Sequence, residues 1–134
     1  MASVEGMLAA LVDLIGADVT IKGMIATRFY PLVIPADKRL PSACYQVITT
    51  QRDYNQSAQS TLTAPRVQIT MSANSYDEAR TLAEAFRSLL SGYKGTSGTV
   101  VFHGIFLENE YDGFSFETEI RTIRQDYRIM FREQ

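Results

Sequence analysis

One stretch of the sequence, residues 66–90, joins a strand pattern to a helix pattern with almost no linker between them. In residues 66–73 apolar and polar side chains alternate, which predicts a strand with one buried face and one solvated face. From residue 79 the apolar residues recur every three or four positions, which predicts a helix that buries one side. Ser75 stands three residues before Glu78, the spacing of a capping box. The unit favours a scaffold over an enzyme, because none of its groups is arranged for catalysis.

The other apolar patterns predict helices and strands on both sides of this unit. They indicate a helix at 4–15, a short turn capped by Asp18, a short strand at 25–30, a strand at 42–52 and two long strands at 99–111 and 120–132. The order is α–(β)–β–β–α–β–β, so we expect an α+β domain with a mainly antiparallel sheet and two helices packed on one face. In the predicted core, the second helix and its strand contribute Leu82, Phe86, Leu89, Val67, Ile69 and Met71.

Length and composition exclude several classes of protein. A chain of 134 residues fits one domain, spanning 1–134, with a substantial core. The net charge of −2 gives no global attraction to nucleic acid. The single Cys44 excludes an internal disulfide and a cysteine-built metal site. No secretory signal and no run of about 20 apolar residues is present, so we expect a cytosolic, unprocessed protein without a membrane partner.

A polar segment at 53–63 interrupts the middle of the chain. It is rich in Asn, Gln, Ser and Thr and almost lacks apolar side chains, although it separates two predicted strands. Such a connection is typical of a long hairpin tip that moves in the free protein. We expect Asp53 and Tyr54, at its start, to contact a partner.

Three candidates for chemistry are weak. His103 is the only histidine, and no nucleophile or orienting carboxylate accompanies it in the sequence. Cys44 lies in a predicted strand and fits a small core residue better than a reactive thiol. The glycines at 92–98 lack phosphate-loop spacing and follow a helix, not a strand, and their match to the GXXG pattern of KH domains is short. We therefore predict no catalytic, cofactor-binding or metal-binding residue.

The last two predicted strands separate acidic from basic residues. Acids surround an expected turn at Gly113, which would place Arg121 opposite Glu108 or Asn109 and leave most acids without a partner in their own chain. Such acids suit a solvated tip, a Mg²⁺ or Ca²⁺ site, or a contact with a neighbouring subunit, and the arginines suit phosphates or acids of another subunit. We favour subunit contacts. The residues expected at a subunit or partner interface are Asp53, Tyr54, Glu108, Glu110, Asp112, Phe114, Phe116, Glu117, Glu119, Arg124, Arg128 and Arg132.

Three blocks of sequence, in this order, carry a family resemblance. They are Arg28-Phe-Tyr-Pro31 with Leu40-Pro-Ser-Ala-Cys-Tyr-Gln-Val47; Arg66-Val-Gln-Ile69 with Ser75-Tyr-Asp-Glu-Ala79; and Glu110-Tyr-Asp112 with Arg124-Gln-Asp-Tyr-Arg-Ile-Met-Phe-Arg-Glu133. With the leading helix they span nearly the whole chain. In this pattern the chain resembles the tail completion, or tail terminator, proteins of long-tailed bacteriophages and prophages. It departs from the family pattern at Ser42 and Gln125, where the family has more apolar residues.

The resemblance implies a structural virion protein without enzymatic activity. Such a protein forms a closed ring, typically a hexamer, at the head-proximal end of the tail tube, ends tube polymerisation and joins the tail to the head. The implied partners are further copies of itself, the tail tube protein and the head–tail connector protein, and DNA passes through the ring without specific binding. Assembly would occur in the host cytoplasm. Two other classes stay open: another neck or tube component, such as a connector, stopper or tube subunit, and an enzyme that uses the acidic tip with a metal.

Overall fold

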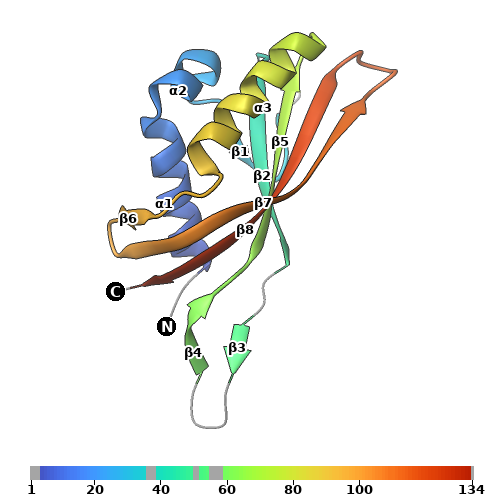
Figure 1. The fold of residues 1–134 in the computed structure, drawn as a ribbon. Helices are drawn as coiled ribbons and strands as arrows, with labels where there is room; N and C mark the ends of the chain where they lie inside the picture. Colours follow the sequence, from blue (N-terminus) through green and yellow to red (C-terminus); the bar gives the residue numbers. More distant parts are fainter. Residues whose placement is uncertain (1–3, 36–38, 50–51, 55–58, 134) are drawn as a thin grey trace.

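The protein is an α+β domain in which the helices cover one face of a twisted sheet (Figure 1). The computed structural model describes all residues except 1–3, 36–38, 50–51, 55–58 and 134. The three helices are α1 (Val4–Ala17), α2 (Val19–Ile25) and α3 (Tyr76–Leu90). The strands are β1 (Phe29–Pro31), β2 (Ser42–Thr49), β3 (Arg52–Tyr54), β4 (Gln59–Thr63), β5 (Arg66–Ala73), β6 (Gly95–Ser97), β7 (Val100–Phe114) and β8 (Arg121–Glu133). The predicted fold class is confirmed.

The last strand, β8, organises the sheet. It pairs with β5 along one side, from Arg66↔Arg128 to Ala73↔Arg121, and β4 continues that side. On its other side it pairs with β7 along nearly its full length. These pairings are antiparallel, and β1 pairs with β2 in parallel, so the sheet is mainly antiparallel as predicted.

The N-terminal region differs from the sequence prediction, which gave two helices in all. Residues 19–25 form a further helix, α2, instead of a short turn followed by a strand. Asp18 caps it, because its carboxylate accepts a hydrogen bond from the Ile21 backbone N–H at 3.0 Å. Ile21 and Ile25 lie four residues apart on one helix face, and both are buried. The strand predicted at 25–30 is therefore shorter and begins only at Phe29.

Both ends of α3 follow the sequence prediction. The Ser75 side chain accepts a hydrogen bond from the Glu78 backbone N–H at 3.1 Å. Beyond the helix, Gly92 has a φ of 80°, a left-handed conformation that favours glycine. Its N–H donates to the carbonyl oxygen of Ile105 at 2.7 Å, so the end of α3 is also tied to β7.

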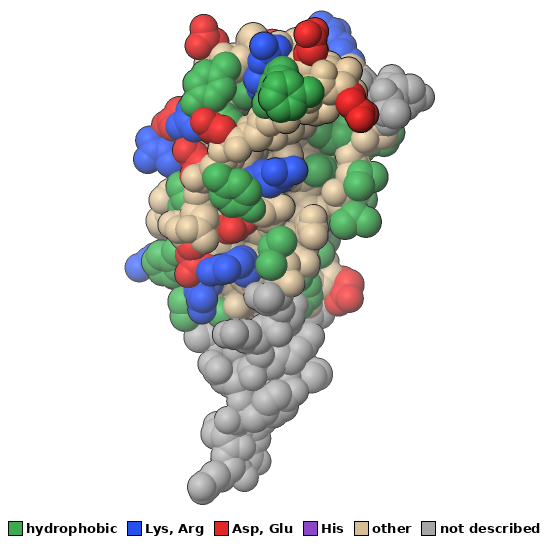
Figure 2. All heavy atoms as spheres, turned by 90° about the vertical axis from the view of Figure 1, so that its right-hand side faces the viewer, with side chains coloured by type: hydrophobic (Ala, Val, Ile, Leu, Met, Phe, Trp, Pro, Cys, Tyr) green, Lys and Arg blue, Asp and Glu red, His purple; other side chains and the backbone are tan. Residues whose placement is uncertain are grey.

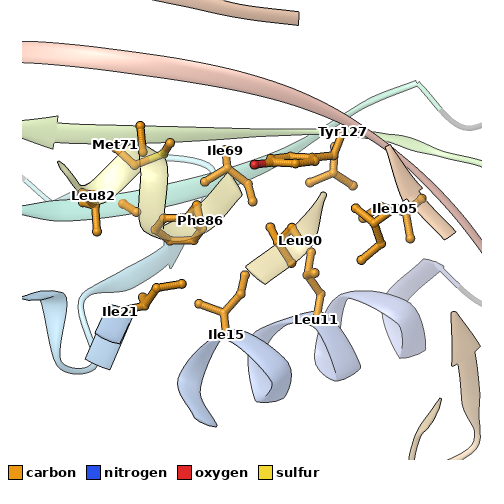
Figure 3. Packing of buried hydrophobic residues seen from close by; sticks show 14 of the residues in the cluster. Leu11, Ile15, Ile21, Ile69, Met71, Leu82, Phe86, Leu90, Ile105 and Tyr127 are labelled. Carbon is orange, nitrogen blue, oxygen red and sulfur yellow. The ribbon is translucent and has the colours of Figure 1, made fainter. Parts of the chain in front are cut away.

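The core lies between the helices and the sheet (Figure 3). Leu82 and Phe86 of α3 are fully buried with the β5 side chains Ile69 and Met71, as predicted. Leu89 is only half-buried and lines a groove between α2 and α3, whereas its neighbour Leu90 is fully buried. Further fully buried core side chains are Met7, Leu11, Ile15, Val67, Ile123, Tyr127 and Phe131.

Two hairpins extend from opposite ends of the sheet (Figure 1). One is formed by β3 and β4, which pair at Arg52↔Thr63 and Tyr54↔Gln59, so the long hairpin predicted across 53–63 is confirmed. The sequence predicts mobility for the whole of 53–63. Residues 53–54 and 59–63 lie in the paired strands β3 and β4, whereas residues 55–58 lie outside the described residues, so the mobility stays a prediction. The other hairpin joins β7 to β8.

Candidate interaction surfaces

The register of the β7–β8 hairpin decides which face each charged residue occupies. Side chains of directly paired residues point to the same face of a sheet. The pair Glu110↔Gln125 therefore lies on the helical side together with the buried Tyr127, two residues further along β8. The pair Tyr111↔Arg124 lies on the opposite face, which no described helix covers.

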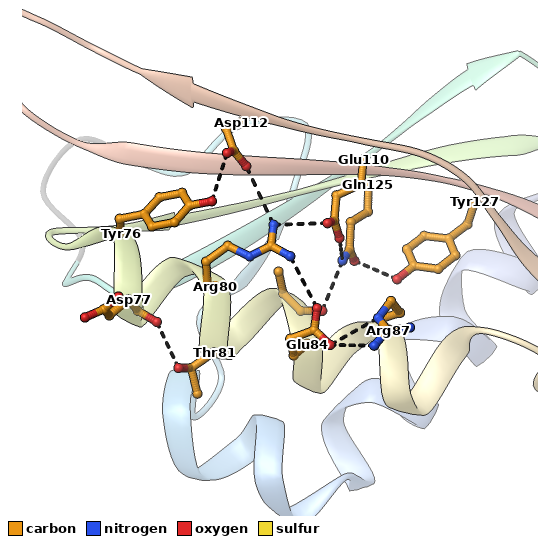
Figure 4. Close-up of polar contacts among 11 residues, drawn as sticks. Tyr76, Asp77, Arg80, Thr81, Glu84, Arg87, Glu110, Asp112, Gln125 and Tyr127 are labelled. Carbon is orange, nitrogen blue, oxygen red and sulfur yellow. Dashed lines mark hydrogen bonds and ion pairs between the residues drawn. The ribbon is translucent and has the colours of Figure 1, made fainter.

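On the helical side, Arg80 of α3 forms ion pairs with two acids of β7 (Figure 4). Its guanidinium lies 3.0 Å from the carboxylate of Glu110, 3.7 Å from that of Asp112 and 3.3 Å from that of Glu84. The Tyr76 hydroxyl donates to Asp112 at 3.0 Å, and this hydrogen bond raises the pKa of Tyr76. The cluster attaches the outer part of the hairpin to the first turns of α3.

Gln125 extends this cluster into the core. It is fully buried, and its amide nitrogen donates to the Ala83 carbonyl oxygen at 3.0 Å and to the Glu110 carboxylate at 2.6 Å. Its amide oxygen accepts a hydrogen bond from the Tyr127 hydroxyl at 2.6 Å, and burial raises the pKa of Tyr127. A buried polar group is tolerated when it is hydrogen-bonded. Gln125 thus links α3, β7 and β8, which explains a polar residue where the resemblance implies an apolar one.

Acidic and basic side chains lie close together on the face without helices (Figure 2), and among them is a second set of ion pairs. The Glu108 carboxylate lies 2.8 Å from the Arg66 guanidinium and 3.0 Å from that of Arg128. These two arginines, Arg66 first, hold the pKa of Glu108 below its ordinary value. Nearby, the Gln68 amide donates to Asp126 at 2.9 Å. These contacts connect β5, β7 and β8 across the sheet.

The prediction that most acids of the hairpin lack a partner in their own chain is therefore wrong. Glu108 pairs with Arg66 and Arg128, and Glu110 and Asp112 pair with Arg80. Arg66 and Arg80 lie on β5 and α3, outside the hairpin, whereas the prediction rested on the arginines of the hairpin itself. Two features of the sequence could have identified these arginines: the strand alternation at Arg66 and the i, i+4 spacing of Arg80 and Glu84.

The turn of this hairpin also lies later than predicted. Strand β7 continues past Gly113 to Phe114, which pairs with Arg121, so Arg121 is not opposite Glu108. A β-bulge between Leu107 and Asn109 adds a further shift in register. The connection comprises residues 115–120, and it is closed by a hydrogen bond from the Ser115 N–H to the Ile120 carbonyl oxygen at 3.0 Å.

Two aromatic rings stand at this tip. The rings of Phe114 and Phe116 meet edge to face with centroids 4.9 Å apart, and the Arg121 guanidinium lies 4.9 Å from the Phe114 ring centroid. Phe116 is 88% exposed. Glu117 and Glu119 are exposed beside it, and neither takes part in an ion pair with another described residue. The predicted interface residues Phe114, Phe116, Glu117 and Glu119 are thus brought together at one point.

The remaining predicted interface residues are distributed over other surfaces. Asp53 and Tyr54 lie in β3, in the hairpin at the opposite end of the sheet from the aromatic tip (Figure 1). Arg124 and Arg132 lie on the face without helices, where the Arg132 Nε donates to the ring nitrogen Nε2 of His103 at 3.2 Å. The structure therefore does not gather the twelve predicted residues into one site.

Chemical groups suited to catalysis do not converge among the described residues. His103 is exposed and accepts a hydrogen bond from Arg132, while Cys44 is half-buried and burial raises the pKa of its thiol. Within the same part of the chain, no three His, Cys, Asp or Glu side chains are placed to hold a metal ion. No described helix is long and apolar enough to cross a membrane.

An apolar pocket opens between α1, α2 and β1. Its volume is about 250 Å³, and it is lined by Val12, Ile15, Gly16, Ile21, Lys22, Ile25, Ala26, Thr27 and Phe29. A larger groove of about 430 Å³ runs between α2 and α3. Both lie on the helical side of the sheet.

Comparison with known proteins gives a match in structure alone. No model of a known protein family matches the chain, and no curated protein matches it. Sixteen chains of solved structures match it. One belongs to the virion of a native gene transfer agent (GTA) particle: it superposes with a TM-score of 0.81 at 15% sequence identity, over 97% of this chain and 98% of that chain. At this identity, the likeness establishes the shared fold.

Proposed function

We propose that this chain is a structural protein of a phage-like particle, and specifically a tail terminator that closes the head-proximal end of a tail tube. The observation that carries the proposal is the end-to-end likeness to a chain of a gene transfer agent virion, which leaves almost no residue of either chain unmatched. A protein that shares only a common core would leave substantial insertions unmatched. The sequence blocks that resemble tail terminators add the specific role.

The arrangement of surfaces supports assembly into a closed ring. In a ring each subunit meets its two neighbours through two different surfaces that complement each other. This chain has an aromatic hairpin tip and, on the other side of the molecule, an apolar pocket between its first two helices and β1 (Figure 1). The proposed partners are further copies of the chain, a tail tube protein and a head–tail connector protein, with DNA passing through the ring without specific binding.

The ion pairs give the acids of the hairpin a role inside the subunit. Glu108, Glu110 and Asp112 hold β7 against Arg66, Arg80 and Arg128 and so keep the hairpin in one orientation. A rigid projection loses less conformational entropy on binding than a mobile one. We propose that subunit contacts come mainly from the tip and from Arg124 and Arg132, with Asp53 and Tyr54 acting at the other hairpin.

The direct test is to remove the chain from a particle-producing cell and to image the particles. A tail terminator sets tube length and joins tail to head, so we expect tubes of uncontrolled length and separate, tailless heads. Supplying the chain from a plasmid should restore attached tails of normal length. Loss of all tubes would indicate a tube subunit, and normal-length but unattached tails would indicate a stopper or connector. Normal particles without the chain would contradict a structural role.

A further inference from the structure

The aromatic hairpin tip carries apolar surface that its own chain does not cover. Phe116 is 88% exposed and Phe114 is 43% exposed, although the two rings are held edge to face. The turn that carries them is shaped by its own hydrogen bonds, including one from the Glu119 N–H to the Ser115 carbonyl oxygen at 2.7 Å. Arg121 fixes the base of the turn by donating to the carbonyl oxygen of Asn74 at 3.0 Å. An ordered, exposed pair of rings is typical of an interface anchor.

The pocket between α1, α2 and β1 offers a complementary concave surface. Buried core residues form its floor: Ile15, Ile21 and Ile25 are each 1% exposed. At its margin, Gly16 is exposed, and a Cβ added there would meet no atom within 4 Å. The pocket is therefore open at Gly16 and apolar at its base, with a volume of about 250 Å³. An aromatic side chain is a suitable occupant, because it buries a large apolar area in such a site.

The tip and the pocket lie on different sides of the same molecule (Figure 1). The tip projects beyond the sheet at the end of β7 and β8, whereas α1 and α2 lie across the helical side of the sheet. One chain therefore does not fill its own pocket with its own tip. Successive copies can fill each other's pockets, because the tip of each copy can enter the pocket of the next. Such a head-to-tail contact closes into a ring when the rotation from one copy to the next permits it.

We infer that Phe116 of one copy inserts into the α1–α2–β1 pocket of the next copy and that this contact builds the ring. The inference rests on the proposed function, since it names the contact by which the proposed ring would form. Charge complementarity supports a second copy as the occupant. Lys22 is the one charged residue among those that line the pocket, and Glu117 and Glu119 flank Phe116 without ion-pair partners among the described residues.

Two single substitutions test the two halves of the contact. Phe116→Ala removes the inserting ring, and Gly16→Phe fills the pocket from its own helix. Gly16 is exposed in α1 and glycine is a poor helix former, so this change is expected to leave the fold intact. Each variant should remain monomeric at concentrations where the unmodified chain is fully assembled, as measured by sedimentation velocity, with unchanged circular dichroism.

Matched controls separate this contact from general effects of the same changes. Gly23→Phe introduces the same side chain at an exposed glycine of α2 that also has open space, but Gly23 lines a different groove. Phe106→Ala removes an exposed ring from β7 on the face without helices. Both controls should assemble like the unmodified chain.

Mixing the two test variants gives the sharpest result. Phe116→Ala retains its pocket and Gly16→Phe retains its tip, so an equimolar mixture should form a 1:1 dimer that grows no further. If both variants assemble normally, this inference is contradicted, but the proposed ring is not. A mixture that yields no dimer has the same meaning. If the unmodified chain does not assemble, the proposed function and this inference are contradicted together.

Discussion

At the scale of single residues, the polar side chains of β7 and β8 are the least expected part of the structure. Gln125 is fully buried and uses both ends of its amide, and Glu108 lies between two arginines from different strands. Neither arrangement follows from local sequence, because the partners Ala83 and Arg66 are separated from them by about forty positions. A contact of this kind depends on the register of the sheet. The register depends on the β-bulge between Leu107 and Asn109, which no sequence pattern predicted.

Replacing Gln125 by leucine should destabilise the protein despite the similar size of the two side chains. The change leaves the Tyr127 hydroxyl, the Ala83 carbonyl and the Glu110 carboxylate without their shared partner. An unsatisfied buried polar group costs about 1–3 kcal/mol, so we expect a loss of about that size in the free energy of unfolding, measured in urea. Gln46→Leu, at an exposed position of β2, is the control and should change it by less than about 0.5 kcal/mol. Equal stability of the two variants would show that the buried network contributes nothing.

The ion pairs of Glu108 should make stability depend on pH. The pKa of Glu108 is lowered in the folded protein, so its contribution is present above the ordinary carboxyl pKa and is lost as the pH falls through the folded value. Glu108→Gln should therefore lower the urea midpoint at pH 7 and leave it close to that of the unmodified chain in acid. The effect should be small, because the side chains of the pair are partly exposed. The same difference between the two proteins at both pH values would assign it to packing instead of charge.

At the scale of elements, patterns within one segment were sufficient to predict several parts of the fold. The strand at 66–73 and the capped helix after it were predicted correctly, because alternation, capping and the glycine stop are all local signals. Helix α2 was missed because seven residues give only two buried positions of a helical pattern. The turn of the last hairpin was misplaced since Gly113 suggested a turn, although it lies within β7, and the chain turns at 115–120.

Helix α3 should be the element on which stability depends most. Phe86 is fully buried, and the centroid of its ring lies 5.8 Å from that of Phe29 of β1. Phe86→Ala should lower the free energy of unfolding by about 3–5 kcal/mol, as large-to-small core substitutions do. Ser91→Ala, outside the helix and exposed, should change it by less than about 0.5 kcal/mol. An unchanged denaturation midpoint for Phe86→Ala would show that the helix does not pack on the sheet as described.

The N-terminal cap of the same helix should contribute less. The Ser75 side chain makes one hydrogen bond to the Glu78 N–H and is exposed to water. Ser75→Ala should cost about 1 kcal/mol, within the usual range for a cap, measured in the same urea titration. Ser75→Asp is the matched control and should retain the stability, because aspartate also caps helices. A loss for Asp as large as that for Ala would mean that the cap is not the cause.

At the scale of the whole molecule, the fold class was predictable and the surfaces were predictable only in part. Alternation and periodicity define what is buried, and burial defines the layers of the fold. The aromatic tip was among the predicted interface residues, but the pocket that could receive it is formed by α1, α2 and β1 together, and no single stretch of sequence displays it. Three of the acids predicted to contact a neighbour, Glu108, Glu110 and Asp112, form ion pairs within their own chain, and their contact with a neighbour stays a prediction.

The central claim is that copies of this chain close into a ring, and the mass of the purified protein in solution tests it most directly. Native mass spectrometry over a range of concentrations, with negative-stain images of the same samples, should show one discrete ring. Its mass should be a fixed multiple of the 15.0 kDa chain, six for a hexamer, and should not rise with concentration. A monomer at every concentration, or filaments that lengthen as concentration rises, would contradict the claim.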